Sequence, residues 1–328
     1  GRLNRPEAAI LVILGRNSVK LSKIIIGAGM ALSLAVTPLA AQERISIGTG
    51  GTGGLFYIIG AGVADLLNQH MPDAFARAEV TGASVENIRR VAADQMTFGF
   101  SSSSTLYEAS VGEGPFEEAL PVSAMAYLYP AVLQVATTAD TGIETLADLA
   151  GKRVNLGPPG SNAAVLGQRL LEAHGAFDPA NVQFISYNEG TAALMNGTLD
   201  ATVVLAGAPT AALIDLGAQR DMRLIPIDAE AAAPMIAQYP FYQYYEIPAG
   251  TYAGQDEAVL AINDPATLFT VQSVPEETVY NITKAIFDNL EELGTVHPQA
   301  GAIALATATN TPIQLHPGAQ RYFDEAAQ

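Results

Sequence analysis

The amino-acid sequence predicts an α/β protein of two lobes. Strand-like segments alternate with helical patterns along the chain, which is typical of parallel sheets covered by helices. Four loops of small residues, two in each half of the chain, follow a strand and lead straight into a helix. The 328 residues exceed the usual size of a single core, and no Gly/Ser-rich linker separates the halves. We therefore expect lobes joined by crossing strands, with residues 42–130 and 251–328 in one lobe and residues 131–250 in the other.

The first of these loops, residues 48–57, reads GTGGTGGLFY and connects the strand-like residues 45–47 to a helical pattern. Glycine lets the backbone approach a ligand closely, and the first amides of a helix have no intrahelical partner. Such a loop is a good site for an anion. The alternative is a tight strand-to-helix turn that binds no ligand.

The sequence of this loop gives little support for a nucleotide-binding site. Residues 48–53 match the dinucleotide pattern G-x-G-x-x-G, but a lone match in a glycine-dense segment is weak. The acidic residue at the expected distance, Asp73, lies in a turn-like segment. A P-loop needs a lysine, and no Lys or Arg lies between Arg44 and Arg77. We therefore expect no cofactor.

Three further loops have the same character. Residues 81–87, TGASVEN, precede a helix for which Ser84 is a candidate N-cap. In the second half, residues 157–162, GPPGSN, and residues 206–210, AGAPT, also open helices. A run of serines, Ser101 to Ser104, follows another strand. Backbone amides and hydroxyls of this kind can hold a carboxylate by fixed dipoles, without a side-chain cation.

Composition and motifs argue against catalysis, metal binding and nucleic-acid binding. The four histidines lie near predicted helix ends, and neither HExxH nor GxSxG occurs. There is no cysteine, which excludes disulfides and thiolate metal sites, and the net charge of -17 disfavours nucleic acid. We expect no catalytic residues and no metal. An enzyme on a similar two-lobed scaffold is an alternative that no motif favours.

The N-terminal segment has the pattern of a secretory signal. A basic stretch, residues 16–23, precedes the apolar residues 24–36, and small residues follow before Gln42. The apolar run of about 13 residues is too short to span a bilayer. We expect residues 1–41 to be a signal peptide with an upstream extension, and the mature protein to be periplasmic. An uncleaved membrane anchor is the alternative.

Six motifs give the chain a family resemblance. It resembles the TAXI-type solute receptors of tripartite ATP-independent periplasmic (TRAP) transporters. The motifs that carry the resemblance are GTGGTGGLFY at 48–57, TGASVEN at 81–87, LADLAGKRVNLGPPGS at 146–161, LAGAPT at 205–210, YPFYQYYEIPAGTYAGQD at 239–256 and HPGAQRYF at 316–323.

The resemblance implies a type II periplasmic binding protein, with two α/β lobes, a hinge and a ligand cleft between the lobes. Such a receptor binds a small carboxylate, glutamate-like or 2-oxoglutarate-like, and delivers it to TRAP membrane subunits. We expect this protein to be a monomer. Carried over by position, the ligand-binding residues are Thr49, Gly50, Gly51, Thr52, Tyr57, Ser84, Asn87, Ser102, Ser103, Ser161, Asn162, Ala163, Gly207 and Ala208.

Two departures from the family pattern fall where the ligand is expected. Many relatives have a Gln followed by Ser or Asn and Asp where this chain has Ser101 to Ser104. They also often have Thr where this chain has Ala163. Both changes concern the identity of the ligand more than the class of protein. A type II binding module that serves as a sensor input, or as the receptor of an ABC transporter, is the alternative.

Overall fold

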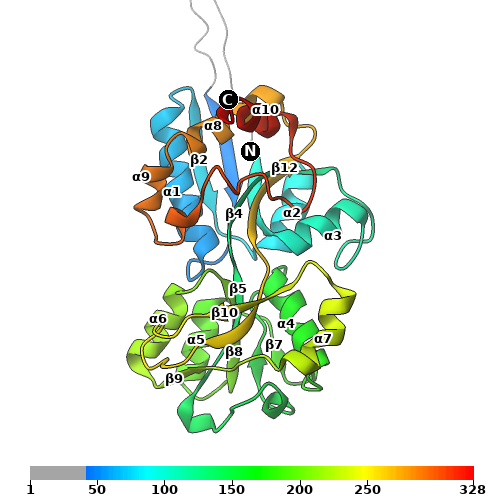
Figure 1. The fold of residues 1–328 in the computed structure, drawn as a ribbon, viewed down its shortest axis with the longest axis vertical. Coiled ribbons are helices and arrows are strands. Elements are labelled where there is room, and N and C mark those ends of the chain that lie inside the picture. The colour runs from blue at the N-terminus through cyan, green and yellow to red at the C-terminus, as the bar shows by residue number, and fades with distance from the viewer. Residues whose placement is uncertain (1–41) are drawn as a thin grey trace, which may run out of the picture. The chain divides into compact units, whose positions relative to one another are not determined.

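A computed structural model describes residues 42–328. The predicted signal peptide and its upstream extension, residues 1–41, lie outside the described residues. Within the described part of the chain the strands form two separate sheets, each with its own helices (Figure 1). We call the unit around the five-stranded sheet the first lobe and the unit around the seven-stranded sheet the second lobe.

The first lobe is built on a sheet with the strand order β2-β1-β3-β12-β4. β1 pairs in parallel with β2 and β3, whereas β12 runs antiparallel to β3 and β4. Its strands are β1 (Glu43–Gly48), β2 (Ala74–Glu79), β3 (Phe98–Ser102), β4 (Val122–Tyr129) and β12 (Ala266–Val271), and its helices are α1 (Leu55–His70), α2 (Ser84–Ala92), α3 (Ser103–Val111), α8 (Glu276–Phe287), α9 (Leu290–Gly294) and α10 (Pro317–Ala326).

The second lobe has the strand order β10-β11-β5-β8-β6-β7, and β9 pairs with β5. β6 is parallel to β7 and β8, and the pairings of β5 and β11 are antiparallel. Its strands are β5 (Val132–Thr138), β6 (Val154–Asn155), β7 (Val182–Gln183), β8 (Ala201–Ala206), β9 (Met222–Leu224), β10 (Gln243–Ile247) and β11 (Val259–Asn263), and its helices are α4 (Asn162–Ala173), α5 (Tyr187–Met195), α6 (Ala211–Gln219) and α7 (Ala229–Gln238).

Both sheets are mixed, so the expectation of parallel sheets was wrong in part. The parallel pairs are those connected by helices, as the alternation predicts. The antiparallel pairs of the first sheet arise where the chain changes lobe, because β4 leaves this lobe and β12 returns to it. The sequence placed residues 251–328 wholly in the first lobe, but β11 pairs in the second sheet.

The chain therefore crosses between the lobes at residues 130–131, between β4 and β5, and at residues 264–265, between β11 and β12. The two crossing segments lie side by side, since the amide of Asp264 donates to the carbonyl of Ala131 at 2.8 Å. Figure 1 shows β4 running on into β5 near the middle of the ribbon. Separate apolar clusters form the cores of the two lobes.

The glycine loop is positioned by α1, whose buried face includes Leu55, Ile59 and Val63 at helical spacing. Thr49 lies beneath this helix and is fully buried. Among residues 42–328, none of the helices combines the length and the hydropathy that crossing a bilayer requires.

Two helical glycines test this packing. A Cβ added to Gly60 of α1 would overlap Thr49 Cγ2 and lie 3.2 Å from Phe100 Cε2. We expect Gly60→Ala to lower the free energy of unfolding by about 1–3 kcal/mol, because the core around Thr49 becomes overpacked. The matched control is Gly217 in α6, where a Cβ meets only Met222 Cε at 3.9 Å.

Gly217→Ala should stabilise the protein by about 0.5–1 kcal/mol, because alanine restricts the unfolded chain. Urea unfolding of both variants measures the two effects. Equal effects of the two substitutions would contradict the packing described here.

Candidate functional site

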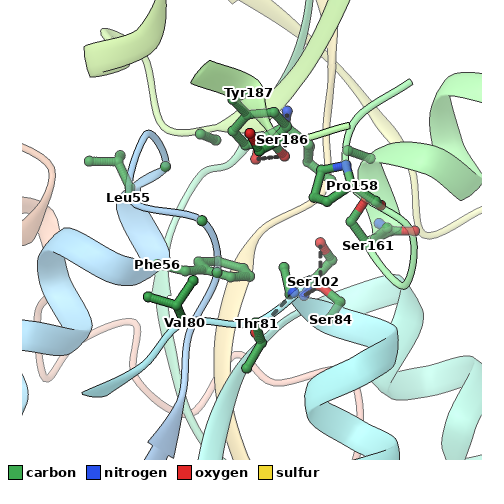
Figure 2. Close-up of a pocket in the computed structure, with 18 residues that line it drawn as sticks. Leu55, Phe56, Val80, Thr81, Ser84, Ser102, Pro158, Ser161, Ser186 and Tyr187 are labelled. Atoms are coloured by element: carbon green, nitrogen blue, oxygen red, sulfur yellow. Dashed lines mark hydrogen bonds between the residues drawn. The ribbon is translucent and has the colours of Figure 1, made fainter. Parts of the chain in front are cut away.

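A pocket of about 130 Å³ lies between the two lobes. Residues of both lobes line it, and several of them come from the glycine- and serine-rich loops (Figure 2). The first lobe contributes Gly50, Gly51, Gly54, Leu55, Phe56, Val80, Thr81, Ala83, Ser84 and Ser102, and the second contributes Pro158, Ser161, Asn162, Ala163, Ser186, Tyr187, Leu205 and Ala206.

Five helices begin at this pocket, α1, α2 and α3 in the first lobe and α4 and α5 in the second. The N-terminus of α5 is closed by a capping box. The Ser186 hydroxyl accepts from the backbone amide of Glu189, and the Glu189 carboxylate accepts from the backbone amide of Ser186. By contrast, α1, α3 and α4 have no acidic residue in their first turns. The start of α3 is nevertheless met by the Asp264 carboxylate, and Ser161 Oγ accepts from a first-turn amide of α4. Of these three described helices, α1 is the one whose positive end has no side-chain acceptor and is available to an anion.

The serine pair Ser84 and Ser102 forms part of the pocket wall. The amide of Ser102 donates to Ser84 Oγ at 2.9 Å, and Ser84 Oγ donates to Ser102 Oγ at 3.4 Å. Within residues 42–328 the hydroxyl proton of Ser102 has no acceptor. Ser102 is thus the pocket hydroxyl that is free to donate to a ligand.

The backbone is strained at Ala83, next to the pair Ser84 and Ser102. Ala83, which precedes α2 and lines the pocket, has φ 77° and ψ -142°. A residue other than glycine in this region carries a cost of about 1–3 kcal/mol, and such residues cluster at binding sites. The sequence made Ser84 the N-cap of α2. That prediction was wrong, because Ala83 holds the cap position and the Ser84 hydroxyl bonds to Ser102 instead.

The second lobe presents Ser161 and Asn162 at the start of α4. Ser161 caps the helix, as predicted, by accepting from the amide of Ala164 at 3.2 Å. It also donates to the carbonyl of Pro158 at 2.6 Å, which fixes the loop. The side chain of Asn162 is directed away from its own lobe and donates to the Asp264 carboxylate at 2.5 Å and to Ser104 Oγ at 3.2 Å.

Asp264 lies in a crossing segment and is fully buried. Its carboxylate accepts from the Ser104 amide at 3.0 Å and from the Ser104 hydroxyl, in addition to Asn162. The carboxylate thereby connects the start of α3 in the first lobe to the start of α4 in the second. Burial raises the pKa of Asp264 to about 6, although these hydrogen bonds act in the opposite direction.

A second buried contact joins the same two helices farther from the pocket. Arg169 of α4 pairs with Glu108 of α3 at 2.7 Å, and both side chains are nearly buried. The guanidinium also donates to Tyr242 Oη at 2.7 Å and lies 3.9 Å from the centre of the Tyr239 ring. Burial raises the pKa of the Glu108 carboxyl despite the opposing effect of Arg169. α3 and α4 are therefore held together along their length.

Seven of the residues that the sequence proposed for ligand binding meet at the pocket. They are Gly50, Gly51, Ser84, Ser102, Ser161, Asn162 and Ala163. Three others make hydrogen bonds inside the first lobe. Thr49 Oγ1 donates to the Glu79 carbonyl at 2.5 Å, Asn87 Nδ2 donates to the carbonyls of Thr49 and Phe100 at 2.8 Å, and Ser103 Oγ bonds Thr267 Oγ1 at 2.8 Å.

The remaining four lie outside the pocket wall. Thr52 accepts a long contact of 3.4 Å from Asn188 Nδ2 of the second lobe. The Ala208 carbonyl accepts from Gln299 Nε2 at 2.9 Å, and a Cβ on Gly207 would lie 2.6 Å from Leu55 Cδ1, so both residues face the first lobe. Tyr57 belongs to α1 and is not part of the wall.

Sequence reasoning missed most of the apolar wall and the start of α5. Leu55, Phe56, Val80, Tyr187 and Leu205 line the pocket, and nothing in their residue types distinguishes them from core residues. Ser186 could have been found, because Ser186-x-x-Glu189 is a capping-box pattern that marks a helix start.

Comparison with known proteins places the chain among solute-binding folds. The family profile described as "NMT1-like family" matches residues 47–326. MatC from Rhodopseudomonas palustris, solved with bound malate, is 18% identical and has a TM-score of 0.53, with 87% of this chain and 97% of that chain covered.

The binding-protein component of an ABC phosphonate transporter from Pseudomonas aeruginosa is 13% identical and has a TM-score of 0.52, with 79% of each chain covered. At these identities the likeness concerns the fold alone. The predicted fold, two α/β lobes of the periplasmic binding protein type, is confirmed.

The buried carboxylate of Asp264 predicts a dependence of stability on pH. Because its pKa is raised from 3.8 to about 6 in the folded state, the folded protein binds this proton more tightly than the unfolded chain. Its stabilising contribution is complete below pH 3.8 and is lost as the pH rises through about 6. We expect a loss of about 2–3 kcal/mol in the free energy of unfolding.

Urea unfolding of the wild type and Asp264→Asn over this pH range measures the contribution. The variant should show a flatter pH dependence, whatever its stability at one pH. Glu108 remains in both proteins, but its charge and that of Asp264 raise each other's pKa, so the difference between the two curves reports the coupled pair. Parallel curves for the two proteins would show that Asp264 does not titrate as described.

Proposed function

The chain belongs to the NMT1-like family, and we propose that it is a periplasmic receptor that binds a small organic acid between its lobes. The observation that carries the proposal is the pocket at which α1 begins with neither a side-chain cap nor an acidic residue in its first turn, and at which the Ser102 hydroxyl is free to donate. An uncapped helix N-terminus and a free hydroxyl donor favour an anion over a neutral or cationic ligand.

The residues that line the pocket suit a protein that binds its ligand without converting it. The polar side chains that line the pocket are hydroxyls and an amide, and the described lining residues include no carboxylate, imidazole, ammonium or guanidinium group. The phenol of Tyr187 donates to the carbonyl of Leu205, and burial raises its pKa to about 12. A ligand that bridges the lobes stabilises the closed arrangement because it has partners on both sides of the cleft. The crossing segments at residues 130–131 and 264–265 then serve as the hinge.

We further propose that the receptor delivers its ligand to the membrane subunits of a TRAP transporter. The motifs of residues 48–57 and 239–256, which resemble TAXI-type receptors, support this partner. Delivery to an ABC transporter is the competing arrangement, and transport into vesicles separates the two. Uptake that needs an ion gradient and no ATP is the result expected for a TRAP partner, and uptake that needs ATP would contradict it.

A thermal unfolding screen tests ligand binding directly. The protein is unfolded and refolded to remove any bound ligand, and then heated with each of a panel of small organic acids and amino acids. A ligand that binds only the folded state adds RT ln(1 + [L]/Kd), about 2.7 kcal/mol at a hundredfold excess over Kd, so the midpoint should rise by several degrees. The proposal fails if no acid raises the midpoint.

Ser102 and Ser103 offer a matched mutational test with whichever acid raises the unfolding midpoint most. Ser102→Ala removes the free pocket donor and should weaken binding by about 1–2 kcal/mol. Ser103→Ala removes a neighbouring hydroxyl that is bonded to Thr267, and it should leave affinity unchanged. Titration calorimetry gives both values. Loss of affinity in Ser103→Ala alone would place the ligand elsewhere.

A further inference from the structure

The motif of residues 239–256 lies away from the pocket. No residue of this segment, which the structure describes in full, lines the pocket wall. Tyr252 of this segment is nevertheless buried, and its ring packs in an apolar cluster of the second lobe. Because a buried phenol usually needs a partner for its hydroxyl, the partners of Tyr252 indicate what this residue does.

The hydroxyl of Tyr252 makes two buried hydrogen bonds. It accepts from the backbone amide of Thr210 at 2.8 Å and donates to Gln134 Oε1 at 2.5 Å. Burial raises the pKa of Tyr252 to about 12, so the hydroxyl keeps the proton that it donates. Removing the hydroxyl would leave the Thr210 amide and Gln134 Oε1 without these partners.

These hydrogen bonds hold the loop of residues 206–210, which connects β8 to α6. Gln134 of β5 donates from Nε2 to the Ala206 carbonyl at 3.3 Å and to Thr210 Oγ1 at 3.1 Å. Thr210 Oγ1 donates in turn to the carbonyl of Gly207 at 2.8 Å. Tyr252 and Gln134 therefore fix both ends of the loop.

The middle of the same loop faces the first lobe. The Ala208 carbonyl accepts from Gln299 Nε2 at 2.9 Å, and a Cβ on Gly207 would lie 2.6 Å from Leu55 Cδ1. Gln299 follows α9, and Leu55 is the first residue of α1, whose positive end is available to an anion. The second lobe thus contacts the first beside the helix start that the proposed ligand would meet.

We propose that Tyr252 is a positioning residue for ligand binding, which holds the 206–210 loop in the shape that packs against Leu55 and Gln299 when the lobes enclose the ligand. Tyr252 acts through the loop and does not touch the ligand. A loop without these hydrogen bonds samples more conformations, and ordering it on closure lowers the apparent affinity. The inference rests on the proposed function, because only a ligand held between the lobes depends on this contact.

Tyr252→Phe tests the inference, because it keeps the buried ring and removes only the hydroxyl. Calorimetry with the acid that raises the unfolding midpoint most should show about tenfold weaker binding than in the wild type. Tyr244→Phe is the matched control from the same segment and should bind like the wild type, since its hydroxyl donates to the Ala229 carbonyl at 2.9 Å within the second lobe. Wild-type affinity in Tyr252→Phe, or an equal loss in both variants, would overturn the inference and leave the proposed function standing.

A double-mutant cycle separates positioning from a general loss of stability. Gln299→Ala removes the donor with which the first lobe meets the loop. Because Tyr252 acts through this loop, Tyr252→Phe should weaken binding by only about threefold or less in the Gln299→Ala background. A loss of stability alone would change affinity by the same factor in both backgrounds, and that additive result would overturn the inference.

Hydrogen exchange examines the loop without a ligand. The Thr210 amide should exchange about tenfold faster in Tyr252→Phe than in the wild type, because its acceptor is gone, and Tyr244→Phe should leave the rate unchanged. Wild-type exchange in Tyr252→Phe would show that the hydroxyl does not hold the loop, and it would overturn the inference. Failure of every acid in the thermal screen would overturn both the inference and the proposed function.

Discussion

The arrangement of the two lobes depends on the buried carboxylate of Asp264. It lies where the chain returns from the second lobe to the first, and it accepts from Ser104 of α3 and from Asn162 of α4. A buried carboxylate that lost one of these donors would be strongly destabilising, so the starts of both helices are fixed relative to the crossing segment. Ser102 and Ser161 lie at those helix starts and line the pocket, so the same contacts that fix the crossing segment also position these two serines.

The function proposed for the pocket follows from the groups with which the pocket can stabilise the charge of a ligand. It offers the N-terminus of α1 and the Ser102 hydroxyl in place of a lysine or arginine, so a carboxylate is stabilised by dipoles that folding has already oriented. The Arg169–Glu108 pair lies along the same helices but away from the pocket, and it contributes to holding the lobes together without competing for the ligand.

The sequence predicted the parts of this protein that local chemistry determines. The glycine loop before α1, the cap of α4 by Ser161 and most strands were visible as patterns. Long-range pairing was not, and so the place of β11 and the antiparallel pairs of β12 were missed. Within the loops, residue type could not separate Ser102, which faces the pocket, from Ser103, which bonds Thr267. Thr49 and Asn87 have the polar groups of a binding residue, yet their partners are backbone carbonyls that only the fold brings near.

A crystal structure with the acid that stabilises the protein most would test the central claim most directly. The account predicts that the acid lies between the lobes, with its carboxylate within hydrogen-bonding distance of Ser102 Oγ and with contacts to residues of both lobes. An acid held by one lobe alone, or bound at another surface, would contradict it.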